Sequence, residues 1–245
     1  MLLIDWGNAR LKWQRRDATG TSAMRAETVT PDTLADTLDQ AWAELPRPDR
    51  VACVSVAGAE RLAQLDQWVT ARWQRPLEVA RSEPRRGRLR NSYPDHQQMG
   101  ADRWIALVGA AAQHDGALVV VDAGSAITAD VVNAAGQHLG GWIAPGRALM
   151  YRALSDGTAA VRPTAVEPEN SFGQDTAGCV AGGIDACMRG LLQEVRRLAP
   201  EDAQAFICGG DGERLRALWP GASWQPDLVL RGLRSWAEDA DLGDR

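Results

Sequence analysis

Apolar residues recur along this chain with the spacings of strands and helices. Leu2–Ile4 is a short apolar run, a turn follows at Gly7-Asn8, and Arg10–Gln14 alternates polar and apolar positions. Alternation with a period of two is typical of a half-buried strand. The start of the chain therefore predicts a strand, a tight turn and a returning strand.

Helical and strand-like segments then alternate to the end of the chain. Thr30 suits an N-cap and Pro31 the first position of a helix over residues 31–45. Further helices are predicted near residues 62–69, over 99–114 and 176–198, as a short segment after residue 211, and near Trp236. Short strands are predicted at residues 51–56, 77–80, 118–121, 131–132, 139–143 and 205–208 and near Leu228. Alternation of this kind indicates an α/β protein.

Two segments about half a chain apart are alike. Each is an apolar strand that runs into Asp-x-Gly-polar-Ala, first at Asp5–Ala9 and again at Asp122–Ala126. This repeat predicts two copies of one α/β domain, with residues 1–115 as the first and residues 116–245 as the second.

The repeated turns suit phosphate chemistry. A carboxylate at a strand end can hold a cation, and a glycine lets backbone N–H groups approach phosphate oxygens. A single Asp-x-Gly after a strand is usually only a turn. Two matched copies, with a third glycine-rich turn at Gly209-Gly-Asp211 that suits adenosine, favour phosphate binding.

Composition and charge narrow the class of protein. The 245 residues are 45% hydrophobic and carry a formal net charge of −5, which fits a folded core and argues against a nucleic-acid or anionic-membrane binder. The longest apolar run, about eight residues near Ile105–Ala112, is too short to span a bilayer. The cysteines lack C-x-x-C spacing and indicate reduced thiols in the cytoplasm.

Residues 81–98 differ from the rest because they have no clear periodicity. This stretch contains two prolines and five arginines, namely Arg81, Arg85, Arg86, Arg88 and Arg90. Loops of this length in compact domains are usually functional or disordered. We expect the arginines to form a solvated rim.

Five motifs occur in one order across nearly the whole chain. They are Asp5-x-Gly-Asn-Ala-Arg-Leu-Lys12, Gly100-Ala-Asp-Arg103, Asp122-Ala-Gly-Ser-Ala-Ile-Thr128, Gly140-Gly-Trp-Ile-Ala-Pro-Gly146 and Gly209-Gly-Asp211. Together they resemble the type III pantothenate kinase family, part of the acetate and sugar kinase, chaperone ATPase and actin superfamily. The resemblance implies two duplicated ribonuclease-H-like domains with a cleft between them.

The resemblance also implies an activity and its cofactors. The activity is ATP-dependent phosphorylation of pantothenate to 4′-phosphopantothenate, the first step of coenzyme A synthesis. The implied cofactors are a monovalent cation, potassium or ammonium, and the magnesium that accompanies ATP. A homodimer is implied, with no nucleic-acid or membrane partner.

Site residues follow by matching motif positions. Asp102 matches the family's general base, a role that fits a carboxylate in phosphoryl transfer. The residues that match ATP contacts are Asp5, Trp6, Gly7, Asn8, Ala9, Arg10, Leu11, Lys12 and Ser125. Those that match the pantothenate pocket are Tyr93, Gly100, Ala101, Asp102, Arg103 and Thr176, and Asp122 matches the monovalent-cation ligand. Ser125 departs from the usual threonine but keeps the hydroxyl.

Two other functions stay open at this level. The chain could be another small-molecule kinase of the superfamily, such as a sugar kinase, although Tyr93 and Gly100–Arg103 argue against it. It could also be a non-catalytic transcription accessory factor on the same scaffold. The presence of Asp5, Asp102 and Asp122 together argues against that loss of activity.

The single lysine of the chain yields a first prediction. Of 27 basic residues, 26 are arginine and only Lys12 is lysine. A compact ammonium can meet phosphate oxygens where a planar guanidinium does not fit. We expect Lys12→Arg to lower kcat/KM for ATP more than replacement of Arg85, Arg86 or Arg88 does. Equal effects in steady-state kinetics would show that position 12 has no special role.

Overall fold

The computed structural model describes residues 1–168 and 172–240. Two compact units account for them. The first comprises Met1–Asp115 together with the residues from Asp227 on, and the second comprises Gly116–Pro226. Within the described residues, no helix is both long and apolar enough to cross a membrane.

The first unit contains a six-stranded sheet. Its main path runs β3-β2-β1-β5-β6, and β4 also pairs with β2. Strand β1 is antiparallel to β2 and parallel to β5, which is parallel to β6. The strands are β1 (Leu2–Trp6), β2 (Arg10–Asp17), β3 (Gly20–Thr21), β4 (Arg25–Thr28), β5 (Val51–Ser55) and β6 (Leu77–Ala80).

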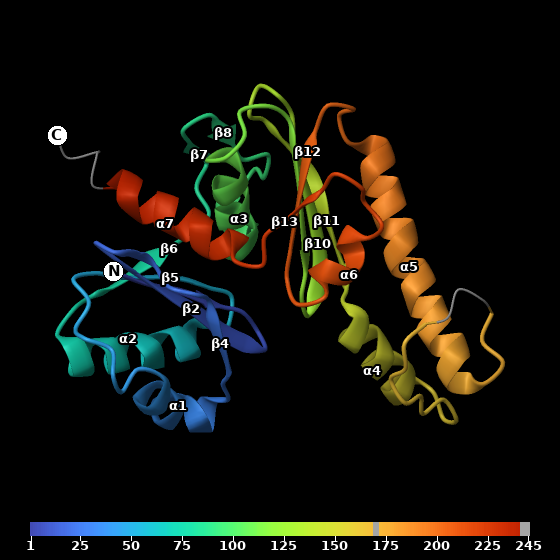
Figure 1. Ribbon diagram of the computed structural model, residues 1–245, viewed down its shortest axis with the longest axis horizontal. Coiled ribbons are helices and arrows are strands. Elements are labelled where there is room, and N and C mark those ends of the chain that lie inside the picture. Colours follow the sequence, from blue (N-terminus) through green and yellow to red (C-terminus); the bar gives the residue numbers. More distant parts are fainter. Residues whose placement is uncertain (169–171, 241–245) are drawn as a thin grey trace. The chain divides into compact units, whose positions relative to one another are not determined.

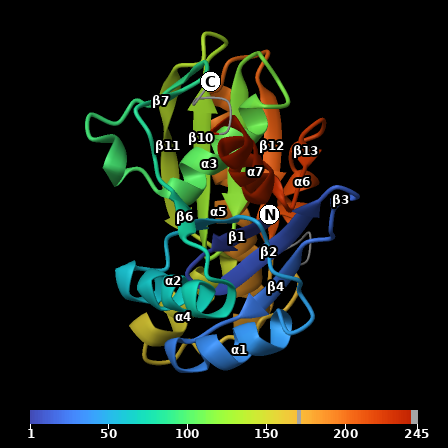
Figure 2. The ribbon, with the colours of Figure 1, turned by 90° about the vertical axis from the view of Figure 1, so that its left-hand side faces the viewer.

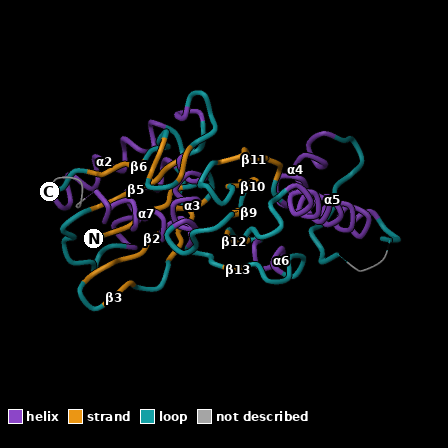
Figure 3. Tube along the Cα trace, turned by 90° about the horizontal axis from the view of Figure 1, so that it is seen from above, coloured by secondary structure: helices purple, strands orange, loops and turns teal. Residues whose placement is uncertain are grey.

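The second unit repeats this topology. Its sheet has the order β11-β10-β9-β12-β13, with β9-β10-β11 antiparallel and β9-β12-β13 parallel. The strands are β9 (Leu118–Ala123), β10 (Ala126–Val132), β11 (His138–Pro145), β12 (Gln204–Cys208) and β13 (Ser223–Trp224). Figure 3 shows these five strands nearly end-on in that order. Both Asp-x-Gly turns thus join the first two strands of a sheet, and the predicted duplication is observed.

Helices cover both faces of the first sheet. Helices α1 (Leu34–Ala41) and α2 (Ala59–Trp73) lie on one face, and α3 (Ala101–Ala111) and α7 (Leu228–Ala240) lie on the other (Figures 1 and 2). Leu2, Ile4 and Trp6 of β1 join the core beneath α1 and α2. Because side chains alternate along a strand, Asp5 faces the opposite side, where α3 lies.

Four tryptophans concentrate in the core beneath α1 and α2. Trp42 stacks on Trp73 with ring centroids 5.5 Å apart and meets Trp13 and Trp68 edge-on. Offset and edge-to-face contacts of this kind stabilise aromatic clusters beyond the area they bury. These four tryptophans therefore contribute to the core of the first unit.

The second unit also contains the helices α4 (Arg147–Gly157), α5 (Thr176–Leu198) and α6 (Gly212–Arg216). Ile184, Met188 and Val195 of α5 belong to the core that includes Val119 and Val121 of β9. Their helical spacing matches the amphipathic pattern that predicted this helix.

Several sequence expectations need correction. The first predicted helix, residues 31–45, is a single turn (Pro31–Thr33) followed by the short α1. Helix α4 was not predicted. The apolar run at Leu228 begins helix α7 rather than a strand, and the last strand is β13 instead.

The last helix also belongs to a different unit from the one expected. Helix α7 packs on α3 in the first unit, not in the second. The two helices cross at glycines. A Cβ on Gly109 would lie 2.6 Å from the Leu228 carbonyl oxygen, and a Cβ on Gly232 would overlap the Ile105 carbonyl oxygen. Only glycine permits so close a helix crossing, a tertiary feature that local periodicity does not reveal.

The helix crossing predicts a contrast between two Gly→Ala substitutions. Gly232→Ala should destabilise the protein by about 1–3 kcal/mol, because the added methyl group forces α3 and α7 apart. Gly183→Ala is the matched control, since Gly183 lies exposed in α5 with nothing within 4 Å of an added Cβ. The control should be stabilising by about 1 kcal/mol from helix propensity. Urea denaturation measures both, and equal stabilities would contradict the close crossing.

Candidate functional site

The first phosphate hairpin is the β1–β2 turn. Asp5 on β1 lies directly opposite Lys12 on β2, and the Lys12 Nζ is 3.4 Å from the Asp5 Oδ2. The Gly7 N–H donates to the Arg10 carbonyl oxygen at 3.1 Å and closes the turn. Asp5 and Lys12 therefore form a cross-strand ion pair at the base of this turn.

Not every residue of this motif can present its side chain to a ligand. Trp6 and Leu11 are buried in the core beneath α1 and α2. Asn8, Ala9 and Arg10 are exposed at the turn. Trp6 and Leu11 can thus contribute only backbone groups to phosphate binding.

Burial controls the electrostatics of Asp5. The residue is 6% exposed. Desolvation raises the pKa of its carboxyl above the usual value, and the nearby Lys12 ammonium opposes that rise. Charge at this position is therefore costly without the lysine.

Asp102 lies in the first turn of α3, and Gly100 is the N-cap of this helix. The Arg103 backbone N–H donates to the Asp102 Oδ1 at 2.8 Å. Burial raises the pKa of Asp102, and the negative charge of Asp5 raises it further. The structure therefore brings the Asp102 carboxyl close enough to Asp5 for the two charges to interact, although the two positions are far apart in sequence.

Tyr93 and Arg103 also meet. The Arg103 Nη1 donates to the Tyr93 hydroxyl oxygen at 3.0 Å, and the guanidinium carbon is 5.9 Å from the centroid of the tyrosine ring. Arg103 is only 6% exposed. Ala101 is the first residue of α3, so the predicted substrate residues 93 and 100–103 lie together where the loop joins this helix.

Two of the loop arginines form hydrogen bonds to other segments, whereas the sequence predicts a rim of solvated side chains. The Arg86 Nη2 donates to the Trp236 carbonyl oxygen at 3.1 Å, and the Arg88 Nη2 donates to the His114 carbonyl oxygen at 2.8 Å. Arg85 is exposed, and its Nε donates to the carbonyl oxygen of Gly87, two residues away. Arg85 is therefore the best control for the lysine at position 12.

The second Asp-x-Gly turn is packed closely by two glycines. A Cβ on Gly209 would overlap the Asp122 carboxylate, and a Cβ on Gly146 would overlap the Gly124 carbonyl oxygen. The Gly146 N–H donates to the Ser125 carbonyl oxygen at 3.0 Å, and the Asp211 N–H donates to the Ala123 carbonyl oxygen at 2.9 Å. The predicted motifs at 122–128, 140–146 and 209–211 thus converge on one turn.

Thr176 is the first residue of α5 and is exposed. The carboxylate of Asp175 caps this helix by accepting from the Gly178 N–H at 2.7 Å. Thr176 belongs to the second unit, whereas Tyr93 and Arg103 belong to the first.

Asp122 is the carboxylate that the sequence predicts as a cation ligand. Among the residues that the structure describes, no three His, Cys, Asp or Glu side chains are grouped to hold a metal ion. Asp122 is half-buried near the end of β9, and a Cβ on Gly209 would overlap both its Oδ1 and the Ala123 carbonyl oxygen. One carboxylate with carbonyl oxygens fits an ion of low charge, while a magnesium ion here would take most of its ligands from phosphate and water.

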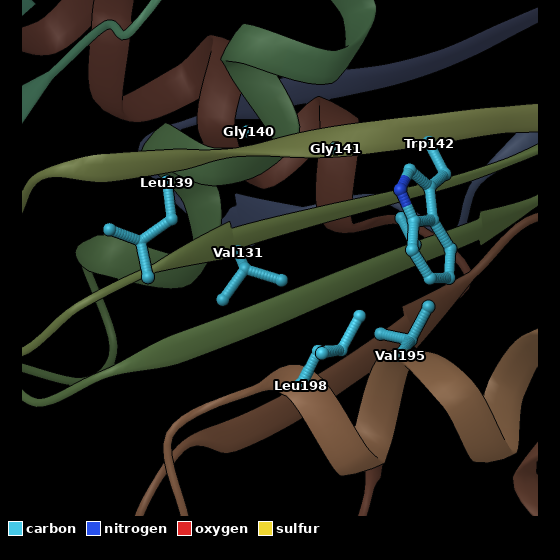
Figure 4. Close-up of a pocket in the computed structure, with 8 residues that line it drawn as sticks. Val131, Leu139, Gly140, Gly141, Trp142, Val195 and Leu198 are labelled. Carbon is cyan, nitrogen blue, oxygen red and sulfur yellow. The ribbon is translucent and has the colours of Figure 1, made fainter.

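An apolar groove was not foreseen. It has a volume of about 390 Å³ and lies between the β10–β11 strands and the end of α5 (Figure 4). Its lining includes Val131, Leu139, Trp142, Val195 and Leu198. Leu139 and Leu198 are each 54% exposed and Trp142 is 40% exposed. The sequence signal that could have revealed this groove is the presence of apolar residues on both faces of the strand predicted over residues 139–143.

Comparison with known proteins agrees with the motifs. The family model "Type III pantothenate kinase" matches residues 1–198. A type III pantothenate kinase from Nitrosococcus oceani is 35% identical over 98% of this chain and 94% of its own length.

Two solved structures share the fold. A protein assigned to the Baf family of transcriptional activators, from Campylobacter jejuni, has a TM-score of 0.62 and 22% identity, with 98% of this chain and 100% of the other covered. A protein assigned as a 2-dehydro-3-deoxygalactonokinase, from Sinorhizobium meliloti, has a TM-score of 0.60 and 16% identity, with 99% of each chain covered. The predicted fold class is thereby confirmed.

Proposed function

Because this chain belongs to the type III pantothenate kinase family, we propose that it transfers the γ-phosphoryl group of ATP to the primary hydroxyl of pantothenate. The products are 4′-phosphopantothenate and ADP, in the first step of coenzyme A synthesis. The observation that carries the proposal is the placement of Asp102 at the start of α3, in electrostatic contact with Asp5 and next to Arg103.

Asp102 is the proposed general base. The pantothenate hydroxyl oxygen forms a bond to the γ-phosphorus while the bond from that phosphorus to the bridging oxygen of ADP breaks. Asp102 accepts the hydroxyl proton as this happens. A raised pKa makes the carboxylate a better proton acceptor than an exposed aspartate, and in phosphoryl transfer positioning supplies most of the remaining rate.

The two turns hold the nucleotide in this proposal. Backbone N–H groups of the motif other than that of Gly7, which closes the turn, bind phosphate oxygens together with the Lys12 ammonium, and Asp5 keeps the ammonium in place. Ser125 supplies a further ATP contact. Arg103 and Tyr93, joined by their hydrogen bond, bind pantothenate together with Gly100, Ala101 and Thr176.

Asp122 is the proposed ligand of a potassium or ammonium ion. A bound monovalent cation would partly neutralise phosphate charge near the second turn. The tight packing of Gly209 against the Asp122 carboxylate supports a fixed carboxylate position. Magnesium would arrive with ATP.

We also propose that the protein is cytoplasmic. None of the four cysteines forms a disulfide, and two of them, Cys179 and Cys187, are exposed on α5. Exposed unpaired thiols suit a reducing compartment.

The deciding experiment measures ADP formation by the purified protein. We expect turnover only when ATP, pantothenate and either potassium or ammonium are all present. Asp102→Asn should lower kcat by about 10²–10⁴-fold, the usual contribution of a general base, while ATP binding persists. If the wild-type protein forms no pantothenate-dependent ADP, the alternative of a non-catalytic transcription accessory factor is favoured. If Asp102→Asn turns over at a near-normal rate, Asp102 is not the general base.

The pH profile tests the same residue. Asp102 must be unprotonated to act, and its pKa is raised above the ordinary value of 3.8. The wild-type kcat/KM should therefore fall as pH falls through that raised pKa, and the residual activity of Asp102→Asn should lack this acidic limb.

The exposed apolar groove supports a homodimer. β11 is an edge strand, and no other strand within residues 1–168 and 172–240 covers its outer side. Ile143 on this strand is 66% exposed and lies outside the lining of the groove, so together with Leu139 and Trp142 in the lining it leaves apolar side chains exposed on β11. Open edges and apolar patches of this kind usually mark an interface. A second copy of the chain is the proposed occupant.

Sedimentation velocity tests the dimer. We expect the wild type to sediment as a dimer and Ile143→Glu as a monomer, because a carboxylate buried at an apolar interface would be unpaired. Leu149→Glu is the matched control, since Leu149 is exposed on α4 rather than on the edge strand β11, and it should remain dimeric. A monomeric wild type, or an unaffected Ile143→Glu, would rule out this interface.

A further inference from the structure

The loop between β6 and α3 is built around one asparagine. Asn91 follows the short hairpin of β7 (Arg85–Arg86) and β8 (Leu89–Arg90). Its Nδ2 donates to the Ser82 Oγ at 3.0 Å and to the Glu83 carbonyl oxygen at 3.3 Å. Its Oδ1 accepts from the Tyr93 backbone N–H at 3.0 Å. The side chain thus joins the start of the loop to Tyr93.

The partners define which way the amide faces. The Tyr93 N–H can only donate, so it requires the amide oxygen, and the Glu83 carbonyl can only accept, so it requires the amide nitrogen. The Asn91 backbone N–H also donates to the Pro84 carbonyl oxygen at 3.0 Å. Asn91 is therefore held by both its backbone and its side chain.

Tyr93 is fixed at two points. Its backbone is held by Asn91, and its hydroxyl accepts from Arg103 on α3. The position of the tyrosine hydroxyl, and of the guanidinium bonded to it, consequently depends on where Asn91 holds the backbone.

The start of the loop is anchored in turn to α7. The Trp236 Nε1 donates to the Glu83 Oε1 at 3.2 Å. The Arg86 Nε lies 3.2 Å from the Glu83 Oε2, and the Arg86 Nη2 donates to the Trp236 carbonyl oxygen. Because α7 also crosses α3 at the glycine contact, the connections form a closed circuit from α7 through Glu83, Asn91, Tyr93 and Arg103 back to α7.

We propose that Asn91 is a positioning residue for pantothenate recognition, acting through Tyr93 and Arg103, with Glu83 and Trp236 as its anchor. This inference rests on the proposed function. Arg103 is a permanent cation that can pair with the carboxylate of pantothenate, and a guanidinium recognises a carboxylate well only in a defined orientation. Trp236 lies beyond residues 1–198, which the family model matches.

Steady-state kinetics with Asn91→Ala tests the role. The variant should raise KM for pantothenate about tenfold, because the lost hydrogen bonds release Tyr93. KM for ATP should stay unchanged, since the nucleotide residues belong to other segments. Asn133→Ala is the matched control: its Oδ1 accepts from the Gln137 N–H at 2.9 Å in a turn of the second unit. This control should leave both KM values unchanged.

A double-mutant cycle separates positioning from general destabilisation. If Asn91 acts through the tyrosine hydroxyl, Asn91→Ala should add little to the increase in KM caused by Tyr93→Phe. Trp236→Phe removes the donor to Glu83 but keeps a ring beneath Arg86. It should raise KM for pantothenate about twofold, and it tests the circuit even if Asn91→Ala fails to fold.

The outcomes are distinguishable. A wild type without pantothenate-dependent turnover would defeat the proposed function itself. An active wild type with an unchanged KM for pantothenate in Asn91→Ala, or with fully additive effects in the cycle, would overturn the role of Asn91 while leaving the proposed function intact.

Discussion

A buried carboxylate on the central strand is the constraint on which the first unit depends. Asp5 faces α3 from within a sheet covered on both sides, and Lys12 on the neighbouring strand compensates its charge. Removing one partner of such a pair leaves an uncompensated charge in a poorly solvated place, which is strongly destabilising. The antiparallel register that sets position 5 against position 12 is therefore as important as either residue.

The same constraint explains the character of Asp102. Burial raises the pKa of the Asp102 carboxyl, and the nearby Asp5 carboxylate raises it further, so Asp102 binds its proton more tightly than an exposed aspartate does. This arrangement costs stability and makes a proton acceptor available at the start of a helix. Unfavourable electrostatic interactions of this kind are usual at functional sites, where residues are selected for chemistry rather than for stability.

Helix α7 connects α3 to the start of the loop that precedes it. Its glycine crossing fixes the depth of α3, and Trp236 fixes the start of the loop that carries Tyr93. Residues from three distant parts of the chain thus share one small region. The second unit has the same strand order, but its turn is held in a different way, by the close approach of Gly146 and Gly209 to the turn.

By itself the sequence determined the fold class, the duplicated hairpins and the family, because strand alternation, glycine turns and motif order are local properties. It also indicated Lys12, since one lysine among 26 arginines stands out. Only the tertiary structure decided that α7 belongs with the first unit, that Arg86 and Arg88 bond to the carbonyl oxygens of Trp236 and His114, and that Asn91 holds Tyr93. These contacts join residues distant in sequence or lie in an irregular loop, and neither periodicity nor composition carries information about which segments approach one another.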